Sequence, residues 1–393
     1  MKKLINDLLR KKFGIEIRKC KSNPNAITLK PEGVSKGNVL LAYITDPFLV
    51  EDESLISNHH TNHWESYLVA KAFLQMGYTV DVISYLDGKF IPLKNYSVFV
   101  SARIHFERIA KLLNNDCIKI VHLDTAHWLF NNSAVLRRSL GVQQKQGVTL
   151  ASFKFIEYNW AIEYADCATV LGNQFTVDTY QYSKKPIYRI PISSCNLYPW
   201  NTDKDFEECR HHFVWFGSHG FVHKGLDLVL KAFANMPEFH LYVCGPISDE
   251  KRFEEAFSKE LYHTPNIHTV GWVDVDSDQF LDICNRCVAL VYPSCAEGGG
   301  GCVIQCMHAG LIPLASYESS VDISDDYGFI LKDFSVTEIM KNVSLVSGLS
   351  ADKVEQMSRK SWEFARANHT RERFFDVFKQ TIRTIISDKK SGI

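Results

Sequence analysis

The hydrophobic and polar positions along the chain alternate between two repeating patterns. Short apolar runs such as Asn38–Ile44 (NVLLAYI) are typical of strands buried on both faces of a parallel sheet. Segments such as Glu65–Met76 carry apolar residues at helical spacing, and this one ends at Gly77, a residue type that commonly terminates helices. The order strand, helix, strand recurs in both halves of the chain, which predicts two parallel α/β sheets.

The polar, irregular stretch Leu197–Arg210 interrupts this alternation and is predicted to be the hinge between two domains. We therefore divide the chain into a basic N-terminal extension, a first α/β domain, a second α/β domain and a closing helical segment, which cover residues 1–30, 31–200, 211–350 and 351–393. Parallel sheets bind ligands beyond the carboxyl ends of their strands. The predicted fold class is α/β, with two Rossmann-like parallel-sheet domains facing across a cleft.

Composition narrows the class of protein. Hydrophobic residues make up 46% of the 393-residue chain, which is enough for two buried cores. The formal net charge of −1 gives no overall field that would attract nucleic acid, and no apolar run is long enough to span a bilayer. The eleven scattered cysteines, with no secretion signal ahead of them, predict reduced thiols and a cytoplasmic location.

The first residues, MKKLINDLLRKKFG, are basic and carry apolar residues at helical spacing. They lack the continuous apolar core and the small-residue cleavage site of a signal peptide. We favour a solvated helix packed on the body of the protein. The alternative hypothesis is a peripheral contact of residues 1–21 with anionic lipid, which would place the protein at the inner face of the membrane.

The most informative segment is Tyr292–Ser316 (YPSCAEGGGGCVIQCMHAGLIPLAS), whose pattern predicts a strand, a glycine turn, a helix and another strand. Glycine lets the backbone approach a ligand closely, and a helix N-terminus carries partial positive charge, so a diphosphate fits there. Glu297 stands at the edge of this anion site. The glycines that enter the helix are Gly298, Gly299, Gly300 and Gly301.

A second segment, Phe213–Leu230, has the same order of strand, turn and helix. Lys224 and Gly225 open its amphipathic helix, where a lysine ammonium group neutralises phosphate oxygens. Taken alone, a lysine before a helix is more often only solvated. Its combination with the glycine turn favours a phosphate-binding role.

Together these segments resemble the donor domain of retaining group-one, family-four-like glycosyltransferases of the GT-B fold. FGSHGFVHKGLDLVLKAF is similar to the family's strand, short loop, Lys-Gly and helix, and PSCAEGGGG to its Pro-Ser, Glu-Gly and glycine stretch. Tyr242–Pro246 (YVCGP) and Asn266–Val273 (NIHTVGWV) resemble its central strand with Gly-Pro and its base-binding loop. The four motifs occur in the family's order within residues 210–320, whereas residues 38–200 share mainly the rhythm of strands and helices.

The resemblance implies a metal-independent hexosyl- or related transfer, with retention and without a cofactor, from a nucleotide-sugar donor to a glycan or glycolipid acceptor in polysaccharide or glycolipid biosynthesis. Lys224 and the glycine N–H groups would stabilise the leaving diphosphate electrostatically. Glu297 would hold the hydroxyls of the donor sugar, and the closing helices would cross back to the N-terminal domain. The further donor-binding positions that it implies are Ser218, His219, Gly245, Trp272, Val273 and Gln305.

Two features depart from the family pattern. The family's second glutamate, which is expected to bind ribose hydroxyls, is Gln305 here, and its neutral amide makes a weaker bond. The family's arginine is missing, and its place falls on Ser218 or His219, depending on the direction of counting. A histidine supplies positive charge only when it is protonated.

On the acceptor side, the resemblance implies a histidine near the donor sugar after a strand. His127 in VHLDTAHW is the first candidate, with His122 and Asp124 as alternates. The family's glycine-rich loop after its first strand is replaced by SNHHTNHWES, where His59 and His60 are candidate contacts to the acceptor or the donor. A packed or solvated role is at least as well supported by the sequence for each of these residues.

One acidic pattern resembles a metal site but has another interpretation. Asp274, Asp276 and Asp278 spell D-x-D-x-D immediately before a predicted helix, where aspartate commonly caps. We therefore favour capping, and the sequence predicts no metal site.

Three other classes of protein are alternatives. A weakened homologue would bind nucleotide-sugar as a non-catalytic partner subunit, which Gln305 and the missing arginine favour. A sugar-nucleotide epimerase of the same fold would share the cleft. A nicotinamide-dependent dehydrogenase would need G-x-G-x-x-G after the first strand, and TDPFLVEDES at that place has no such glycines.

Overall fold

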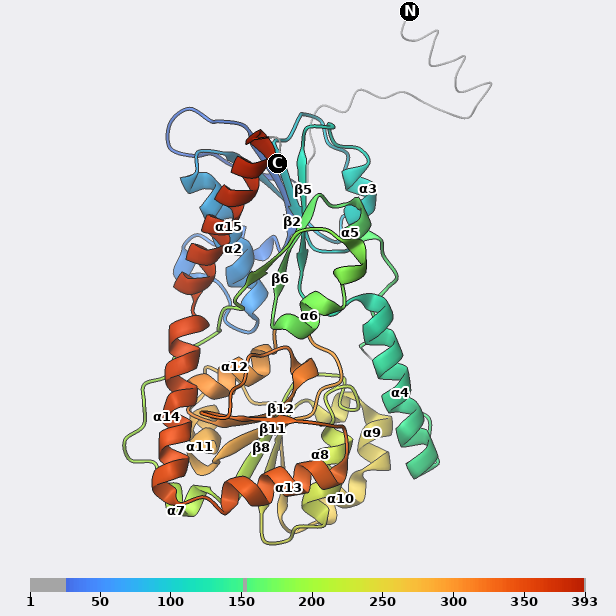
Figure 1. Cartoon of the computed structure of the whole chain (residues 1–393), viewed down its shortest axis with the longest axis vertical. Helices are drawn as coiled ribbons and strands as arrows, with labels where there is room; N and C mark the ends of the chain where they lie inside the picture. The colour runs from blue at the N-terminus through green and yellow to red at the C-terminus, as the bar shows by residue number, and fades with distance from the viewer. Residues whose placement is uncertain (1–25, 151–153, 392–393) are drawn as a thin grey trace, which may run out of the picture.

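The structure is a computed structural model that describes residues 26–150 and 154–391. It consists of two α/β domains stacked end to end, with the C-terminal helices running along both (Figure 1). The expectation of a helix or lipid contact within residues 1–21 lies outside the described residues.

The N-terminal domain is built on a seven-stranded sheet in the order β1-β3-β2-β4-β5-β6-β7. Strand β1 is antiparallel to β3, and the other neighbours are parallel. Buried apolar runs form the central strands because helices cover both faces of the sheet. The strands are β1 (Ile27–Leu29), β2 (Asn38–Tyr43), β3 (Thr79–Ser84), β4 (Val98–Ser101), β5 (Ile118–Leu123), β6 (Cys167–Leu171) and β7 (Ile187–Ile190).

The C-terminal domain has a six-stranded parallel sheet in the order β10-β9-β8-β11-β12-β13. The direction of winding reverses between β8 and β11, which leaves a crevice at the carboxyl ends of these two strands. Two parallel-sheet α/β domains were expected from the sequence, and the structure confirms them. The strands are β8 (His212–Phe216), β9 (His240–Cys244), β10 (Ile267–Gly271), β11 (Ala289–Tyr292), β12 (Ile312–Ser316) and β13 (Phe329–Leu331).

The helices alternate with the strands as expected, but several of them differ from the prediction. Helix α2 begins at Thr61 rather than near Glu65, because the side chain of His60 caps it. Helices α4, α5, α6, α7 and α13 were not expected. The helices are α2 (Thr61–Gln75), α3 (Phe106–Ala110), α4 (Trp128–Gln146), α5 (Ala161–Tyr164), α6 (Gln174–Asp178), α7 (Phe206–Cys209), α8 (Leu226–Ala234), α9 (Lys251–Ala256), α10 (Ser258–His263), α11 (Asp278–Arg286), α12 (Gly301–His308), α13 (Val336–Ser347), α14 (Ala351–Asn368) and α15 (Arg371–Ser391).

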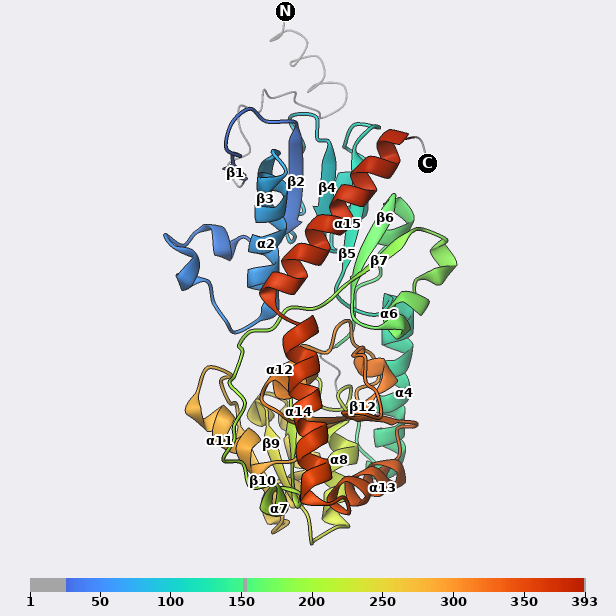
Figure 2. The ribbon, with the colours of Figure 1, turned by 60° about the vertical axis from the view of Figure 1, so that its left-hand side comes forward.

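The last two helices connect the domains. Helix α14 packs on the C-terminal domain, and α15 crosses the N-terminal domain diagonally (Figure 2). The ring centroids of Phe378 on α15 and Phe73 on α2 lie 6.2 Å apart. Between the two helices, His369 donates from Nδ1 to the carbonyl of Ile192 at 3.1 Å. This bond ties the junction to the chain between β7 and α7, which joins the two domains and which we call the interdomain linker.

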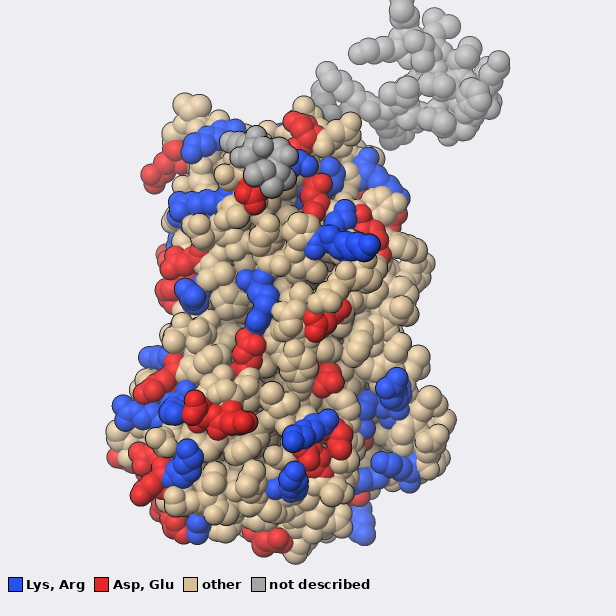
Figure 3. Space-filling view, in the orientation of Figure 1, with Lys and Arg blue, Asp and Glu red and all other residues tan. Residues whose placement is uncertain are grey.

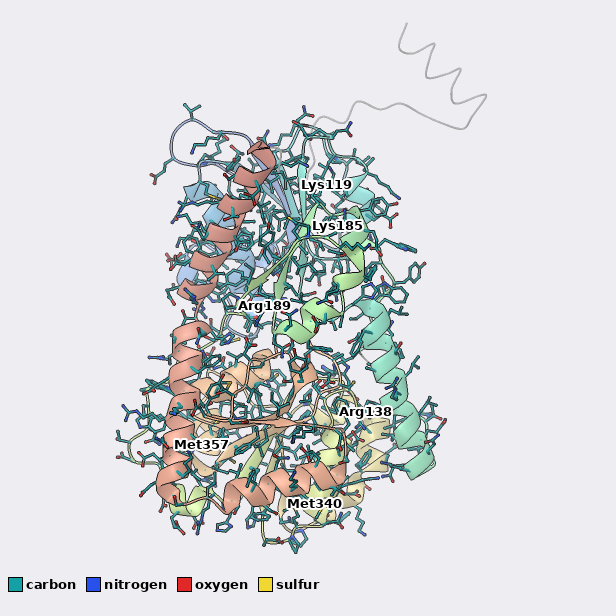
Figure 4. All side chains as sticks on the ribbon, viewed as in Figure 1. Lys119, Arg138, Lys185, Arg189, Met340 and Met357 are labelled. Atoms are coloured by element: carbon teal, nitrogen blue, oxygen red, sulfur yellow. The ribbon has the colours of Figure 1, made fainter. Side chains whose placement is uncertain are left out.

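Helix α4 also spans both domains, because it starts in the N-terminal domain and runs down beside α8 and α9 (Figure 1). Arg138 lies between α4 and the C-terminal domain (Figure 4), and its Nη2 donates to both carboxylate oxygens of Asp227 at 2.7 and 2.9 Å. Both side chains are largely buried, and Val142 joins the apolar core of the C-terminal domain. This helix therefore fixes the two domains relative to each other.

The aspartate-capping hypothesis is wrong in detail. Ser277 caps α11 by accepting from the N–H of Phe280, and Asp278 is the first helical residue. Asp274 instead accepts from the N–H of Asp276, and Asp276 pairs with Asn196 of the linker. A hydroxyl on the residue just before the helix is better placed than the carboxylates around it.

The surface carries charges of both signs in small, mixed groups on the face seen in Figure 3. Within residues 26–150 and 154–391, no helix combines the length and the apolar character that a bilayer-spanning segment requires.

Candidate functional site

A cavity of about 510 Å³ lies between the two domains, and we call it the interdomain cleft. Its walls come from the loops after β2, β4 and β5 in the N-terminal domain and after β8, β9, β10 and β11 in the C-terminal domain. These are carboxyl ends of parallel strands, where the turns are free to present polar groups. The expected cleft between the domains is confirmed.

The floor of the cleft holds an ion pair between the two segments that the sequence singled out. Lys224 Nζ lies 3.5 Å from Glu297 Oε1 and donates to the hydroxyl of Tyr292 at 3.0 Å. The same Glu297 oxygen accepts from Tyr292 at 3.0 Å and from Ser294 Oγ at 2.9 Å, and His223 Nε2 lies 3.5 Å away. The lysine and glutamate motifs, 73 residues apart, therefore form one cluster.

Burial would raise the pKa of the Glu297 carboxyl, but Lys224 and His223 hold that pKa well below its ordinary value. Burial likewise acts to lower the pKa of the Lys224 ammonium group, and Glu297 reverses this and raises it. Both side chains are thus charged at neutral pH. A buried cation and anion held side by side are well suited to a polar ligand that carries phosphates and hydroxyls.

The two loops are bound to each other through the backbone, which explains why the pair forms. The N–H of Cys295 in one loop donates to the carbonyl of His223 in the other at 2.9 Å. Within the lysine segment, Trp215 Nε1 donates to the carbonyl of Lys224 at 3.2 Å. Gly225 has a φ of +72°, and a Cβ there would lie 2.4 Å from the carbonyl oxygen of Pro293. Only glycine fits that turn.

The glycine run has a second role that the sequence did not reveal. A Cβ on Gly298 would lie 2.2 Å from the backbone of Thr125, so this glycine is pressed against the N-terminal domain. Gly299 contacts Ile192, and Gly300 has a φ of +58° as the residue that precedes α12. Helix α12 still begins at the cleft, which Gly300 and Gly301 line, and the first N–H groups of a helix have no partner within it.

A second lysine reaches the cleft from the segment before α5. Lys154 lines the cavity, and the charge of Lys224 lowers its pKa, with a further contribution from burial. Two ammonium groups near each other repel, which favours an anionic ligand between them. Together with the N-terminus of α12, they make the floor of the cleft a site for negative charge.

The N-terminal wall presents an ion pair of its own. Arg103, in the loop after β4, binds Asp124, in the loop after β5. Both line the cleft, together with the exposed side chains of His59 and His60. His59 Nδ1 lies 3.5 Å from Asp274 of the opposite domain, so the histidine loop closes one end of the cavity.

Glu65 of α2 is the least expected member of this wall. Its side chain is buried and lines the cleft, and its Oε1 accepts from the N–H and the hydroxyl of Ser193, each at 3.1 Å. Oε2 is buried and has no hydrogen-bond partner among the described residues. Burial raises the pKa of this carboxyl to about 7, against the lowering effect of Ser193.

The structure brings most of the predicted site residues to one cavity. The positions that line it come from both motifs, the base-binding loop and the acceptor-side loops. They are His59, His60, Asp124, Ser218, Lys224, Gly245, Trp272, Val273, Glu297, Gly298, Gly300, Gly301 and Gln305.

Four predicted residues do not line the cleft, which corrects the sequence interpretation: Gly299, where an added Cβ would lie against Ile192, and three histidines. His127 caps α4 and contacts the hydroxyl of Tyr182 through Nε2 at 3.0 Å, so it lines a different cavity. His122 is buried within β5, where Nδ1 contacts Thr169 Oγ1 at 2.8 Å. His219 turns away from the cleft and lies 2.9 Å from Asp249.

Gln305 lines the cleft, but its amide is already occupied. Its Oε1 accepts from the N–H groups of Cys195 and Asn196 at 3.1 and 3.2 Å. Its Nε2 donates to the carbonyl of Asn196 and to the hydroxyl of Tyr198 at 3.0 and 2.9 Å. In this structure Gln305 holds the interdomain linker, and a ribose contact would have to replace one of these bonds.

The residues of the site that the sequence interpretation missed include Glu65, Arg103, Lys154, His223 and Tyr292. Tyr292 and His223 adjoin the recognised motifs, so their proximity was a usable signal. Glu65 looked like an ordinary polar position of an amphipathic helix. Its burial depends on the linker passing over α2, which no local pattern indicates.

Among residues 26–150 and 154–391, no three His, Cys, Asp or Glu side chains converge in a way that would hold a metal ion. The positive charges that line the cleft include those of Lys154, Lys224 and Arg103.

Two α/β domains that face across a cleft define the GT-B class of fold. The sequence of residues 211–360 matches the family model described as "Glycosyl transferases group 1". The resemblance seen in the donor-domain motifs is therefore confirmed for this part of the chain. The search of curated proteins gives no match.

Solved structures share the fold at low sequence identity. A glycosyltransferase from Rickettsia africae is 11% identical with a TM-score of 0.57, covering 90% of this chain and 98% of that chain. The Anabaena protein HepE, in complex with UDP and glucose, is 11% identical with a TM-score of 0.53, covering 89% of this chain and 99% of that one.

A TarM mutant from S. aureus, in complex with fondaparinux, α-GlcNAc-glycerol and UDP, is 12% identical with a TM-score of 0.50. The match covers 81% of this chain but only 58% of the TarM chain, so the protein spans under two thirds of that relative. At these identities the likeness concerns the fold.

Proposed function

We propose that the protein is a glycosyltransferase that binds a nucleoside diphosphate sugar in the interdomain cleft and transfers the sugar to a glycan or lipid-linked acceptor. The observation that carries this proposal is the buried pair of Lys224 and Glu297, which faces the N-terminus of α12 between two GT-B domains. The group 1 family match over the same domain supports it.

In this proposal, Lys224 and the first N–H groups of α12 bind the diphosphate and stabilise the charge that develops as it leaves. Lys154 adds a second cation from the N-terminal side. Glu297 accepts hydrogen bonds from the donor sugar. These groups supply the positive charge that the reaction needs, and we propose a metal-independent, retaining hexosyl or related transfer.

The nucleotide would extend from the diphosphate toward Gly245, Trp272 and Val273, which line the cleft at the ends of β9 and β10. Trp272 is 58% exposed, so its ring is available to a base. The Anabaena and S. aureus neighbours were solved with UDP, which makes uridine diphosphate the first nucleotide to test.

The acceptor would enter along the N-terminal wall, next to His60, Glu65 and Asp124. A buried carboxyl with a pKa of about 7, like that of Glu65, suits a group that exchanges a proton with a hydroxyl near neutral pH. We place the reaction in the cytoplasm, in the synthesis of a polysaccharide or glycolipid.

One observation favours a second candidate, a weakened homologue that binds nucleotide-sugar as a non-catalytic partner subunit. Gln305 stands in place of the family's ribose-binding glutamate and is hydrogen-bonded to the linker. The place of the family's arginine holds Ser218 or His219, and the latter faces Asp249. Binding without turnover is the property that separates this candidate from the enzyme.

The experiment is a thermal-shift screen of the full chain against nucleoside diphosphates and their sugars, followed by product analysis with any donor that binds. A ligand of the native cleft raises the melting temperature. A transferase releases nucleoside diphosphate and glycosylates an acceptor, an epimerase isomerises the donor alone, and a binding subunit gives the shift only. No shift with any nucleotide would contradict the proposal.

A further inference from the structure

Two cavities on the N-terminal domain continue from the interdomain cleft. The first, of about 730 Å³, lies between α3 and the segment before α5, and shares Arg103, Phe155 and Ile156 with the cleft. The second, of about 630 Å³, lies beside the start of α4 and shares Trp160 with the first. We call these two adjoining cavities the aromatic groove.

The groove carries aromatic side chains that the fold leaves exposed. Phe155, Tyr158 and Trp160 line its first cavity, and they are 49%, 71% and 48% exposed. Tyr182, on the wall of the second cavity, is 53% exposed. Large aromatic rings gathered on a surface are typical of a binding site, because water solvates them poorly.

The backbone beneath these rings is anchored, although it has no regular secondary structure. Asn132 Nδ2 donates to the carbonyl of Ile156 at 2.8 Å, and the N–H of Ile156 donates to Asn132 Oδ1 at 2.9 Å. Asn131 Nδ2 binds the carbonyl of Lys154 at 2.8 Å. Two asparagines of α4 thus hold Lys154 and Ile156, at the start of the segment that carries Tyr158 and Trp160.

The first cavity also has polar groups beside its rings. Arg108, Lys111, Glu157 and Asn159 line it, and His105 on the same wall adopts a left-handed backbone with a φ of 57°. Such a conformation is uncommon for a residue other than glycine. Strained residues are often found where a protein presents a side chain to a ligand.

This mixture of surfaces identifies the kind of ligand. A pyranose ring has an apolar C–H face that stacks on an aromatic ring and a rim of hydroxyls that needs hydrogen-bonding partners. An acyl chain would need a lining with few charges, and this cavity has charged side chains next to its rings. The continuity with the cleft indicates a ligand that extends from the reaction site.

We propose that the aromatic groove binds the saccharide chain of an acceptor, with sugar units stacked on Tyr158 and Trp160 and the chain end in the interdomain cleft. This inference rests on the proposed glycosyltransferase function and specifies its acceptor: an extended glycan rather than a small alcohol or a single sugar. It also assigns a binding role to a segment outside the family's donor motifs.

The test uses an array of defined, immobilised oligosaccharides probed with the full chain and three variants. The first variant is Tyr158→Ala with Trp160→Ala. The second, Tyr158→Phe with Trp160→Phe, keeps two stacking rings. The third, Tyr262→Ala, removes a similarly exposed tyrosine from α10, away from the groove. A thermal shift with UDP is measured for each protein.

We expect the unaltered chain to bind at least one extended glycan, and the alanine pair to weaken that binding by about tenfold or more. The phenylalanine pair and Tyr262→Ala should retain it. Binding of no glycan, or equal binding by the alanine pair, would overturn the inference. The UDP shift reports the donor site separately, so its loss would count against the proposed function instead.

Discussion

Lys224 Nζ and Glu297 Oε1 lie 3.5 Å apart at the floor of the interdomain cleft, although the two residues belong to different strand–turn–helix units. We expect Lys224→Met to weaken the binding of UDP by about tenfold to a hundredfold, because a charge-assisted hydrogen bond to the diphosphate is lost. Isothermal titration of UDP measures this effect.

The matched control is Lys231→Ala on α8, the helix that follows Lys224, because the Lys231 ammonium group lies over the ring of Phe257 and not in the cleft. That variant should bind UDP as the unaltered chain does. Equal UDP affinity for Lys224→Met and the unaltered chain would remove the diphosphate site from this place.

Glu65 predicts a specific dependence of stability on pH. Its carboxyl has a pKa of about 7 in the folded protein, against 4.5 as the ordinary value. A raised acid pKa contributes stability below pH 4.5, and that contribution is lost as the pH rises toward 7. Glu65→Gln should therefore gain up to about 3 kcal/mol relative to the unaltered chain between pH 4.5 and pH 8.

Denaturant unfolding of both proteins at a series of pH values measures this difference. The other titratable groups are the same in the two proteins, so their contributions cancel. A difference in stability that does not change with pH would show that Glu65 is ionised when folded. In that case the carboxyl would be unsuited to exchange protons near neutral pH.

Gln305→Glu, which introduces the residue of the family pattern, should destabilise the protein rather than improve it. The hydroxyl of Tyr198 already donates to the carbonyl of Val275 at 2.7 Å, so it must accept from Gln305 Nε2. A carboxylate would place an oxygen against this hydroxyl and against the carbonyl of Asn196. We expect a loss of about 1–3 kcal/mol in the free energy of unfolding.

Gln305→Met is the companion variant, since it removes the same hydrogen bonds without adding charge and should cost a similar amount. The contrary result would be a Gln305→Glu variant that is as stable as the parent and binds UDP more tightly. It would show that the linker contacts of Gln305 are not needed for stability and that a glutamate at this position binds the ribose.

The stability of variants at Arg138 shows whether α4 holds the two domains together. Its bidentate bond with Asp227 is nearly excluded from water, so Arg138→Ala leaves a buried carboxylate without its partner. We expect a loss of about 3–5 kcal/mol. Arg137→Ala, the neighbouring and exposed arginine, should change stability by less than about 0.5 kcal/mol.

Replacing both partners with apolar residues, Arg138→Met with Asp227→Leu, should recover most of the stability, because no charge is then left buried. Equal melting temperatures for Arg138→Ala and Arg137→Ala would contradict a structural role for the pair.

Acid should loosen the junction between α14 and α15. Burial lowers the pKa of His308 and of His369 to about 4, and Nε2 of His308 donates to the carbonyl of His369 at 2.9 Å. A histidine with a lowered pKa contributes stability above pH 6.5, and this is lost as the pH falls toward 4.

We therefore expect stability to fall by about 3 kcal/mol per histidine over this range. His308→Gln with His369→Asn should reduce the fall, whereas His263→Gln at an exposed position should not. Circular dichroism during denaturant unfolding at pH 7 and pH 4 makes the comparison.

The two segments that carry Lys224 and Glu297 could be predicted from sequence because each is a local unit. The strand that ends at Phe216, the glycine at position 225 and the helix after it are close in the chain, and their geometry follows from backbone preferences. The same holds for Glu297 and the glycines before α12. Buried apolar runs likewise indicated two parallel sheets.

Helix α4 could not be recognised in the same way. Asn131, Asn132 and Gly141 interrupt its apolar pattern, and the asparagines face the segment 154–156 rather than solvent. At His127 the sequence predicted a function that the structure does not support. Its place after a strand suggested a residue near the donor sugar, whereas its ring caps helix α4. Both features depend on contacts with residues that are distant in the chain, which a local pattern does not reveal.

The sequence by itself determined most of the strands, though not β1 or β13, and the turns that carry the two charged groups of the cleft. These features depend on interactions between residues near one another in the chain. The tertiary structure alone decided that Glu65 is buried and that the side chain of Gln305 forms its hydrogen bonds with the interdomain linker. It also decided the contact of Gly298 with Thr125. Burial and hydrogen-bond partners at these positions come from segments many tens of residues away, and no local pattern encodes which segments those are.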